Sequence, residues 1–260
     1  MNPKVSVIVP AYRTDPFIED CIESILSQTY DNLEAVIVYE RDDSFMVDLL
    51  AKMEDPRIVH VKQDKNVGLS NARNMGIAAS SGELIALCDG DDLFYPEKLE
   101  RQVETICSGY DLTYTDVDII DDEGNIIGTS TTPEWDLKLW LRRTYIAASS
   151  ILFRRNLTAR VGVFDEDLHA NEDLDFLIRA AGVAKIKRTP GVLTARRIHS
   201  SNMSRKIFKN VGTRFSVYRR HGYTGLAFYA ALKNIVVTPL LLWIMNRPSV
   251  YRKLKNLRQL

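Results

Sequence analysis

Two clusters of carboxylates in the sequence have the spacing that chemistry on charged substrates requires. Asp89-Gly90-Asp91-Asp92 and Glu172-Asp173-Leu174-Asp175 each place three acidic side chains within four residues. Carboxylates this close repel one another unless a cation sits among them. The first cluster therefore predicts a cation site, with a solvated acidic turn as the alternative. The second also fits the first turn of a helix, where acidic side chains favour the positive end of the dipole.

The residues before the first cluster indicate where it lies. Glu83–Cys88 has the pattern of a buried strand, and it places the acidic loop directly at its carboxyl end. In parallel α/β sheets, ligands bind at that edge. Mg²⁺ and Mn²⁺ prefer oxygen ligands and leave coordination positions for phosphate oxygens. A metal there would offset the charge that develops on a diphosphate leaving group.

The first half of the chain alternates strand and helix patterns. Such an order predicts an α/β fold, with a mainly parallel, Rossmann-like sheet flanked by helices on both faces. We expect strands at Lys4–Val9, Glu34–Tyr39, Arg57–Val61 and Glu83–Cys88, and helices from Asp15 and Pro16 to Leu26, at Phe45–Glu54, at 69–80 and at Pro96–Ser108. The binding edge then consists of the loops Pro10–Thr14, Tyr39–Ser44, Asp64–Leu69 and Asp89–Phe94.

The second half is less regular. We expect strands at Asp111–Thr115, Ser149–Phe153 and 191–197, a hairpin at Asp118–Thr129, and helices at Asp136–Arg143 and Leu174–Ala181. From about Ser204 onward the pattern is helical and basic. Cys21, Cys88 and Cys107 each lie in an apolar stretch at scattered spacing, which favours buried, reduced thiols over a disulfide or a metal cluster.

Charge is distributed very unevenly along the chain. The net charge is zero, but residues 1–175 hold all 34 acidic residues with 16 Lys and Arg, whereas residues 176–260 hold 18 Lys and Arg and no acid. This asymmetry indicates an anionic neighbour: a membrane surface, the diphosphate of a lipid carrier, or the acidic first part of the protein. We do not expect a nucleic-acid partner, because the basic residues form no recognisable nucleic-acid module.

The basic extension also contains an apolar segment, residues 225–245. Only Ile235–Met245 is continuously near-apolar, which is shorter than the ~20 residues of a spanning helix. We expect peripheral membrane contact through residues 225–258, with packing on the catalytic domain or a second subunit, and then a true span, as alternatives. Met1 is followed almost at once by a strand pattern, so we expect no signal peptide and a location at the cytoplasmic face of the membrane.

Six segments, in order, resemble the inverting glycosyltransferases of family 2. They are VSVIVPAY (5–12), SILSQTY (24–30), NVGLSNARN (66–74), GELIALCDGDD (82–92), PEKL (96–99) and EDLD (172–175). The resemblance covers roughly residues 4–200 and implies the GT-A fold. It further implies a GT-A catalytic domain at 1–203, with a nucleotide-sugar-binding half (1–110) and an acceptor-binding half (111–203), and a basic helical extension at 204–260.

The resemblance implies a role for each matching residue. It places the donor nucleotide-sugar at Pro10, Ala11, Tyr12, Glu40, Asn66, Gly68, Arg73, Asp89 and Gly90. It assigns a divalent metal, Mn²⁺ or Mg²⁺, to Asp91 with Asp89 and His199. Asp173 is then the general base, and Glu172 positions the acceptor. For Arg73, a salt bridge to an aspartate of the acidic loop is the other interpretation, and it does not exclude a diphosphate contact.

The chain departs from the family at the end of its second strand. The family has two aspartates there, the second of which reads the base, whereas this chain has Tyr39 and Glu40. Glu40 can accept the same hydrogen bond, or Asp42 or Asp43 takes its place. A UDP-sugar is the first expectation for the donor, and a lipid-linked or polysaccharide glycan of the cell envelope for the acceptor.

Two other functions stay open from the sequence. A non-catalytic nucleotide-sugar binder or scaffold would explain the change at Tyr39 and Glu40. A sugar-phosphate nucleotidyltransferase would share the sheet and the acidic ligands, but residues 10–14 lack the glycine-rich, basic loop that such enzymes carry. The sequence does not fix the oligomeric state, and a homo-oligomer stays open.

Overall fold

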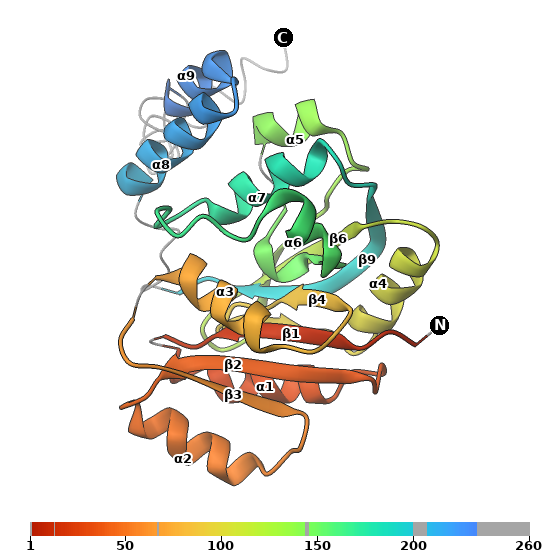
Figure 1. Cartoon of the computed structure of the whole chain (residues 1–260), viewed down its shortest axis with the longest axis vertical. Coiled ribbons are helices and arrows are strands. Elements are labelled where there is room, and N and C mark those ends of the chain that lie inside the picture. The colour runs from red at the N-terminus through yellow and green to blue at the C-terminus, as the bar shows by residue number, and fades with distance from the viewer. Residues whose placement is uncertain (1, 13, 67, 144–145, 200–206, 233–260) are drawn as a thin grey trace, which may run out of the picture. The chain divides into compact units, whose positions relative to one another are not determined.

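The alternating apolar runs of the first hundred residues form parallel strands in the computed structural model of the chain (Figure 1). The structure describes residues 2–12, 14–66, 68–143, 146–199 and 207–232. The chain divides into two compact units, Met1–Asn202 and Met203–Leu260. Each unit is described by itself below.

Four of the expected strands make the parallel part of the sheet. They are β1 (Val5–Pro10), β2 (Leu33–Glu40), β3 (Ile58–Gln63) and β4 (Leu84–Leu87), in the spatial order β3-β2-β1-β4. Every residue of β1 is buried between β2 and β4. This burial explains its continuous apolar sequence, since a central parallel strand is covered on both faces. The four loops after these strands therefore meet at one edge of the sheet.

Helices cover both faces of this sheet. α1 (Ile18–Leu26), α2 (Ser44–Met53) and α4 (Lys98–Cys107) share one core with Val5, Val7 and Val9. α3 (Leu69–Ala79) packs on the other face, where a Cβ on Gly76 would lie 2.5 Å from Ile8 Cγ2. The expected helices are confirmed, but α1 begins at Ile18 rather than at Asp15 and Pro16.

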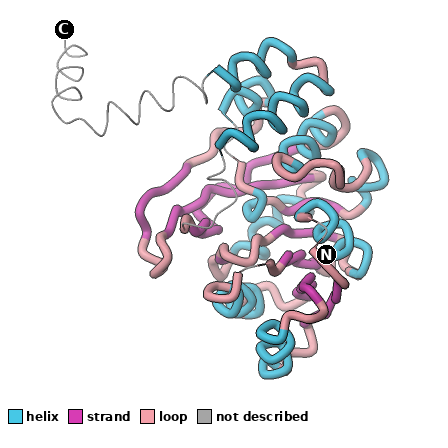
Figure 2. Tube along the Cα trace, turned by 90° about the vertical axis from the view of Figure 1, so that its left-hand side faces the viewer, coloured by secondary structure: helices cyan, strands magenta, loops and turns pink. Residues whose placement is uncertain are grey.

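The second half of the first unit extends the sheet with strands of both directions. The order continues as β8 (Leu152–Arg154), β6 (Leu112–Ile120), β9 (Ile186–Arg197) and β5 (Leu93–Phe94), and β7 (Ile126–Ser130) pairs with β6. β8 is antiparallel to β4 and β6, whereas β6 and β9 are parallel. In a view turned by 90°, strands of this unit run between helices, except at the left, where strands extend beyond the helices (Figure 2).

Three helices and a 3-10 turn complete the first unit. They are α5 (Leu137–Arg143), α6 (Asn156–Val161), α7 (Glu172–Ala181) and η1 (Ala148–Ser150). α7 begins with the second acidic cluster, two residues earlier than the apolar spacing indicates. α6 and β5 were not expected, and β9 is longer than the predicted strand 191–197.

The prediction of three buried thiols is wrong for one of them. Cys21 and Cys88 are buried, with their sulfur atoms 3.6 Å apart, but Cys107 is exposed. Cys107 is the last residue of α4, whose buried residues include Val103 and Ile106 but not Cys107. All three are free thiols.

The described part of the second unit is a pair of helices, α8 (Ile207–Arg220) and α9 (Thr224–Leu232). They pack through Phe215 and Phe228, whose ring centroids are 5.4 Å apart. Within the described residues, no helix has both the length and the apolar character that crossing a membrane requires. Most of the apolar segment 225–245, and the basic residues up to 258, lie outside the described residues.

Candidate active site

The acidic loop follows β4 and is pressed against the end of β1. A Cβ on Gly90 would lie 3.0 Å from Ile18 Cδ1 and 3.2 Å from the carbonyl oxygen of Pro10. These distances are tighter than ordinary contacts, so only glycine fits without displacing a neighbour. Gly90 therefore allows the loop to approach the strand that carries the predicted donor residues.

Asp92 is buried under the loop and binds protein groups with both oxygens. Its Oδ2 accepts a hydrogen bond from Ser149 Oγ at 2.5 Å, and its Oδ1 accepts one from the backbone N–H of Arg197 at 2.9 Å. Burial, and then the charges of Asp91 and Asp89, raise the pKa of Asp92 well above its usual value. Asp92 thus fixes the loop to η1 and β9 rather than facing a ligand.

Asp91 and His199 come together from segments far apart in the sequence. Asp91 Oδ2 lies 2.8 Å from His199 Nε2, and the His199 ring packs against Phe17 with centroids 4.9 Å apart. Burial and the charge of Asp89 raise the pKa of Asp91, while His199 acts against this rise. Two of the three predicted metal ligands are therefore adjacent.

The third predicted ligand, Asp89, has a different partner. Its Oδ1 accepts a hydrogen bond from Arg73 Nη2 at 2.6 Å. Among the described residues, no three His, Cys, Asp or Glu side chains are grouped so that they could hold a metal ion by themselves. One carboxylate and one imidazole, at Asp91 and His199, fit a divalent cation that takes its other ligands from water and substrate phosphates.

Arg73 connects the two acidic clusters. Its side chain on α3 is 1% exposed, and it donates to Asp89 through Nη2 and to Glu172 Oε1 through Nη1. Burial alone would lower the pKa of Arg73, but Asp89 and Glu172 raise it above its usual value. The structure therefore shows the salt bridge to the acidic loop and adds a second carboxylate to it.

The start of α7 presents its three acidic side chains differently. Glu172 is buried against Arg73, and Asp175 is buried and accepts from Arg179 Nε at 2.8 Å. Asp173 is only half-buried. Burial raises the pKa of Glu172 to about 7, although the Arg73 guanidinium lowers it. Glu172 therefore faces Arg73.

The residue before α7 sets its direction. Asn171 has φ 61°, in the left-handed region that few residues other than glycine adopt. Asparagine tolerates this conformation better than most side chains. The turn brings Glu172 to Arg73 at the very first position of the helix.

The predicted donor residues occupy the ends of β1, β2 and β3. Pro10 ends β1, Ala11 is buried and donates its N–H to the Val38 carbonyl, and Tyr12 is 45% exposed. In the third loop, Asn66 Oδ1 accepts from the N–H of Gly68 at 2.8 Å. Gly68 precedes α3 with φ 98°, which requires glycine.

The last residues of β2 and the loop after it contain the candidates for recognising the nucleotide base. Tyr39 is buried, with its hydroxyl 3.4 Å from His60 Nδ1. Asp43 caps α2, because its Oδ1 accepts from the N–H of Met46. Glu40 is half-buried at the end of the strand, and Asp42 is exposed. Asp43 Oδ1 is therefore engaged by the start of α2.

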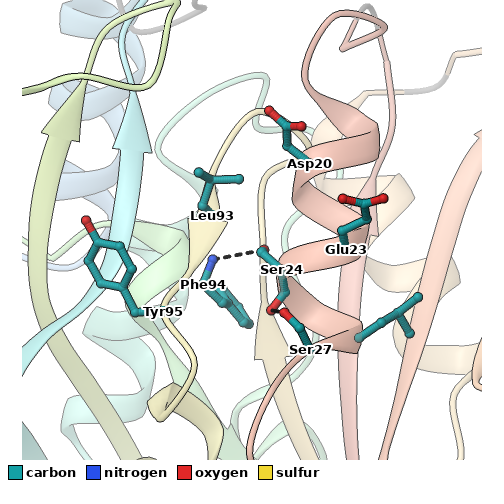
Figure 3. A pocket seen from close by; sticks show the side chains of 8 residues that line it. Asp20, Glu23, Ser24, Ser27, Leu93, Phe94 and Tyr95 are labelled. Carbon is teal, nitrogen blue, oxygen red and sulfur yellow. Dashed lines mark hydrogen bonds between the residues drawn. The ribbon is translucent and has the colours of Figure 1, made fainter.

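A groove of about 650 Å³ lies between α1 and β5 (Figure 3). Asp20, Glu23 and Ser24 line it from the helix, and Leu93 and Tyr95 lie across from them. Ser24 Oγ accepts the N–H of Phe94 and so ties the helix to the strand. None of the predicted site residues lines this groove.

Two residues that hold the acidic loop were not identified from the sequence. Ser149 Oγ donates to Asp92 and accepts a hydrogen bond from the N–H of Asp89 at 3.0 Å. Arg197 donates to Asp91 and Asp92. The sequence signal for Arg197 is its position two residues before His199, which places both on one face of an extended chain.

Solved structures share this fold. The chain matches the Staphylococcus aureus TarS 1–349 structure, in complex with UDP-GlcNAc, with a TM-score of 0.69 at 20% identity, over 84% of this chain and 65% of that one. It matches the mannosyltransferase PcManGT of Pyrobaculum calidifontis, in complex with GDP-Man and Mn²⁺, with a TM-score of 0.65 at 20% identity, over 91% and 71%. The fold is therefore the GT-A fold of glycosyltransferases.

The sequence comparisons identify the family. The model of glycosyl transferase family 2 matches residues 6–164. The glycosyltransferase YwdF of Bacillus subtilis, described as uncharacterized, is 32% identical over 199 residues, which cover 72% of this chain and 71% of YwdF. The chain belongs to glycosyltransferase family 2.

A second relative carries a specific activity in its name. The UDP-Glc:alpha-D-GlcNAc-diphosphoundecaprenol beta-1,3-glucosyltransferase WfaP of Escherichia coli is 27% identical over 245 residues, 89% of this chain and 94% of WfaP. Other relatives are much longer. The chain spans 36% of an uncharacterized glycosyltransferase of Rickettsia felis, at 31% identity.

Proposed function

We propose that this family-2 glycosyltransferase moves a sugar, with inversion, from a nucleoside-diphosphate sugar to an acceptor hydroxyl. Asp173 is the general base, and Asp91 and His199 hold a divalent cation, Mn²⁺ or Mg²⁺. The observation that carries the proposal is the bridge from Asp89 through Arg73 to Glu172, because it brings the acidic loop and the start of α7 to one place.

The loop serves the leaving group. When bound, the cation would offset the negative charge that develops on the nucleoside diphosphate as the bond to the sugar breaks. Asp91 and His199, with Oδ2 and Nε2 2.8 Å apart, supply an oxygen and a nitrogen donor for it. Asp89 forms an ion pair with Arg73, and 37% of its side chain is exposed. It is therefore accessible to the ribose or the cation.

The start of α7 serves the nucleophile. Asp173 accepts the proton of the acceptor hydroxyl as its oxygen attacks the anomeric carbon from the side opposite the diphosphate. Glu172 and Asp175 are buried in ion pairs, whereas Asp173 is half-buried, which supports Asp173 as the member of the cluster that meets the acceptor. We assign Glu172 to orienting Arg73 and the helix start.

The donor is expected to be a UDP-sugar. The name of WfaP includes UDP-Glc, and the matched TarS complex contains UDP-GlcNAc, which support uridine. The PcManGT complex contains GDP-Man, so a GDP-sugar is the alternative donor. Tyr12, exposed after the end of β1, is assigned to stacking on the base, and Glu40 to accepting its N–H.

We further propose a lipid-linked acceptor for cell-envelope glycan, with peripheral contact at the cytoplasmic face of the membrane through residues 225–258. The diphosphoundecaprenol acceptor in the name of WfaP supports this, as does the absence of acidic residues after Asp175 in the sequence. Within the described part of the segment, Phe228 and Tyr229 on α9 are exposed. Aromatic side chains next to basic ones favour a membrane interface.

Thermal-shift measurements on the full chain test the donor site. UDP, GDP, CDP and ADP are compared with and without Mn²⁺, since stabilisation follows ligand affinity. We expect UDP with Mn²⁺ to raise the melting temperature most. No further stabilisation by any nucleotide beyond that of Mn²⁺, or equal responses to all four nucleotides, would contradict the proposed donor site.

Co-sedimentation of the full chain with vesicles tests the membrane contact. Vesicles with anionic lipid should bind the chain, and purely zwitterionic vesicles should bind it more weakly, because the extension is basic. Equal partitioning to both would contradict attraction by the basic residues, and no partitioning to either would remove the membrane from the proposal. Neither result would affect the transfer reaction.

A further inference from the structure

Arg197, the last residue of β9, lies buried below the acidic loop. Its side chain is 3% exposed. Its Nε donates to the carbonyl oxygen of Asp91 at 3.1 Å, and its backbone N–H donates to Asp92 Oδ1 at 2.9 Å. One residue thus binds the loop twice, once through the side chain and once through the main chain.

The same guanidinium reaches two other segments. Its Nη1 donates to the carbonyl oxygens of Asp122 at 2.9 Å and Asp121 at 3.3 Å, in the turn between β6 and β7. It also lies over the Phe17 ring, 4.6 Å from the centroid, at the start of α1. Arg197 therefore joins the acidic loop, the β6–β7 turn and α1.

The ion pair that this guanidinium makes within the described residues is a weak one. Arg197 Nη2 is 3.6 Å from Asp20 Oδ2, and Asp20, which lines the groove in Figure 3, has 63% of its side chain exposed. An exposed ion pair contributes little. The geometry of Arg197 is thus set mainly by backbone carbonyl groups. A guanidinium can donate to several of them at once through its rigid, planar set of N–H groups, which lysine does not possess.

Phe17 extends this arrangement to the second proposed metal ligand. Its ring contacts both the Arg197 guanidinium and the His199 imidazole, with centroid distances of 4.6 Å and 4.9 Å. Asp91 and His199 are therefore both positioned by the same pair, Arg197 and Phe17. Neither member of the pair is among the residues for which the family resemblance implied a role.

We propose that Arg197 is a positioning residue that holds the backbone of Asp91 so that its carboxylate faces His199, with Phe17 supporting both. This deepens the proposed function and rests on it for the identity of the cation. Arg197 acts through Asp91 and Asp92 and does not itself touch the substrate. Because the turn at Asp121 and Asp122 binds the same guanidinium, the loop is also fixed to the half of the domain expected to bind the acceptor.

The test compares Arg197→Lys with Arg188→Lys in the full chain. Arg188 lies on the same strand and pairs with buried Asp116 at 2.5 Å rather than with the acidic loop. Partners that orient metal ligands typically change metal affinity about 10- to 100-fold when mutated. We expect R197K to raise the Mn²⁺ concentration for half-maximal activity about tenfold, with an unchanged KM for the donor at saturating Mn²⁺, and R188K to leave both unchanged.

Hydrogen exchange gives a readout that does not depend on activity. Amides of the acidic loop should exchange faster in R197K than in the wild type and in R188K. The N–H of Asp92 is bonded within the loop, to the carbonyl of Asp89, and that bond opens more often once Arg197 no longer holds the loop. Unchanged exchange together with unchanged Mn²⁺ activation in R197K overturns the inference, as do equal effects in R188K.

Two further outcomes are also decisive. If R197K does not fold, Phe17→Leu replaces it as the test, because it removes the ring beneath the guanidinium. F17L should then raise the Mn²⁺ concentration for half-maximal activity and speed the exchange of the loop amides. No shift in F17L would then count against the inference. If the wild type neither transfers sugar nor responds to Mn²⁺, the proposed function fails, and the exchange of the loop amides alone decides whether Arg197 positions the loop.

Discussion

The acidic loop and the start of α7 contain the same number of carboxylates, but protein groups hold them in different ways. In the loop, Asp92 is held by neutral donors, a hydroxyl and an amide. In the helix, Glu172 is held by the guanidinium of Arg73. Each cluster also contains a less buried carboxylate to which we assign chemistry, Asp91 or Asp173.

This comparison separates the residues that anchor the two clusters, Asp92 and Glu172, from the residues to which we assign chemistry. Burial raises the pKa of Asp92 well above its usual value, whereas Arg73 limits the rise for Glu172 to about 7. Asp92 is therefore anchored by two neutral hydrogen-bond donors, whereas Glu172 is anchored by a cation. In each cluster, the residue to which we assign chemistry is less buried than the anchor.

Separate replacements of Asp91 and Asp92 should give the largest difference between a residue assigned to chemistry and an anchoring residue. Asp91→Ala should lower transfer roughly 10³-fold, since metal stabilisation of a leaving group is worth several kcal/mol. Asp92→Ala should instead lower the free energy of unfolding by roughly 2–4 kcal/mol, because Ser149 and the N–H of Arg197 lose a buried acceptor. Steady-state kinetics and urea unfolding measure the two effects. Similar losses of stability in both variants would contradict the division.

Removing Arg73, which bridges the two clusters, should strongly lower the free energy of unfolding. Arg73→Met leaves Glu172 buried without its cation, and breaking such a pair typically costs roughly 3–5 kcal/mol of folding free energy. A double variant, Arg73→Met with Glu172→Met, should regain much of that stability, since the buried charge of Glu172 is removed as well. Urea unfolding of the two variants tests this. A double variant no more stable than R73M would show that the pair is not the source of the loss.

The titration of Glu172 predicts a smaller, pH-dependent effect. Its pKa is raised from 4.5 to about 7 in the folded chain. The folded chain therefore keeps a proton that the unfolded chain loses over this range, so the contribution of Glu172 to stability is complete below pH 4.5 and falls as the pH rises towards 7. The change is roughly 3 kcal/mol.

Glu172→Gln isolates this contribution. The difference in free energy of unfolding between wild type and E172Q should change between pH 4.5 and about 7 and stay constant above that range. Denaturant titrations at several pH values provide the measurement. A difference that is flat across the whole range would place the pKa of Glu172 near its ordinary value.

The sequence was sufficient to predict the parallel half of the sheet and its binding edge. The continuous apolar runs of β1, β2 and β4 fit a doubly covered sheet, and the place of the polar loops follows from the strand direction. β5 could not be predicted in this way. It consists of two residues that are strand only because they pair with Ala195 and Thr194 of β9.

The contacts of the site were less accessible from sequence than its residues. Type and spacing singled out the two acidic clusters, and the resemblance to family 2 implied the roles of Asp89, Asp91 and Asp173. The partners of Arg73 depend on tertiary packing. The two interpretations of Arg73, a diphosphate contact or a salt bridge, could not be separated by local pattern. Arg197 was overlooked for the same reason, because the groups that bind its side chain are backbone carbonyls, an exposed acid and the ring of Phe17.

The central claim is that Asp173 is the general base, and Asp173→Asn tests it most directly. A positioned base typically contributes roughly 10²–10⁴-fold to the rate, so transfer by D173N should fall by about that factor. Binding of the donor nucleotide with Mn²⁺, measured by titration calorimetry, should equal that of the wild type. Transfer at an undiminished rate, or a wild type that binds donor and never transfers, would contradict the account and favour a non-catalytic nucleotide-sugar binder.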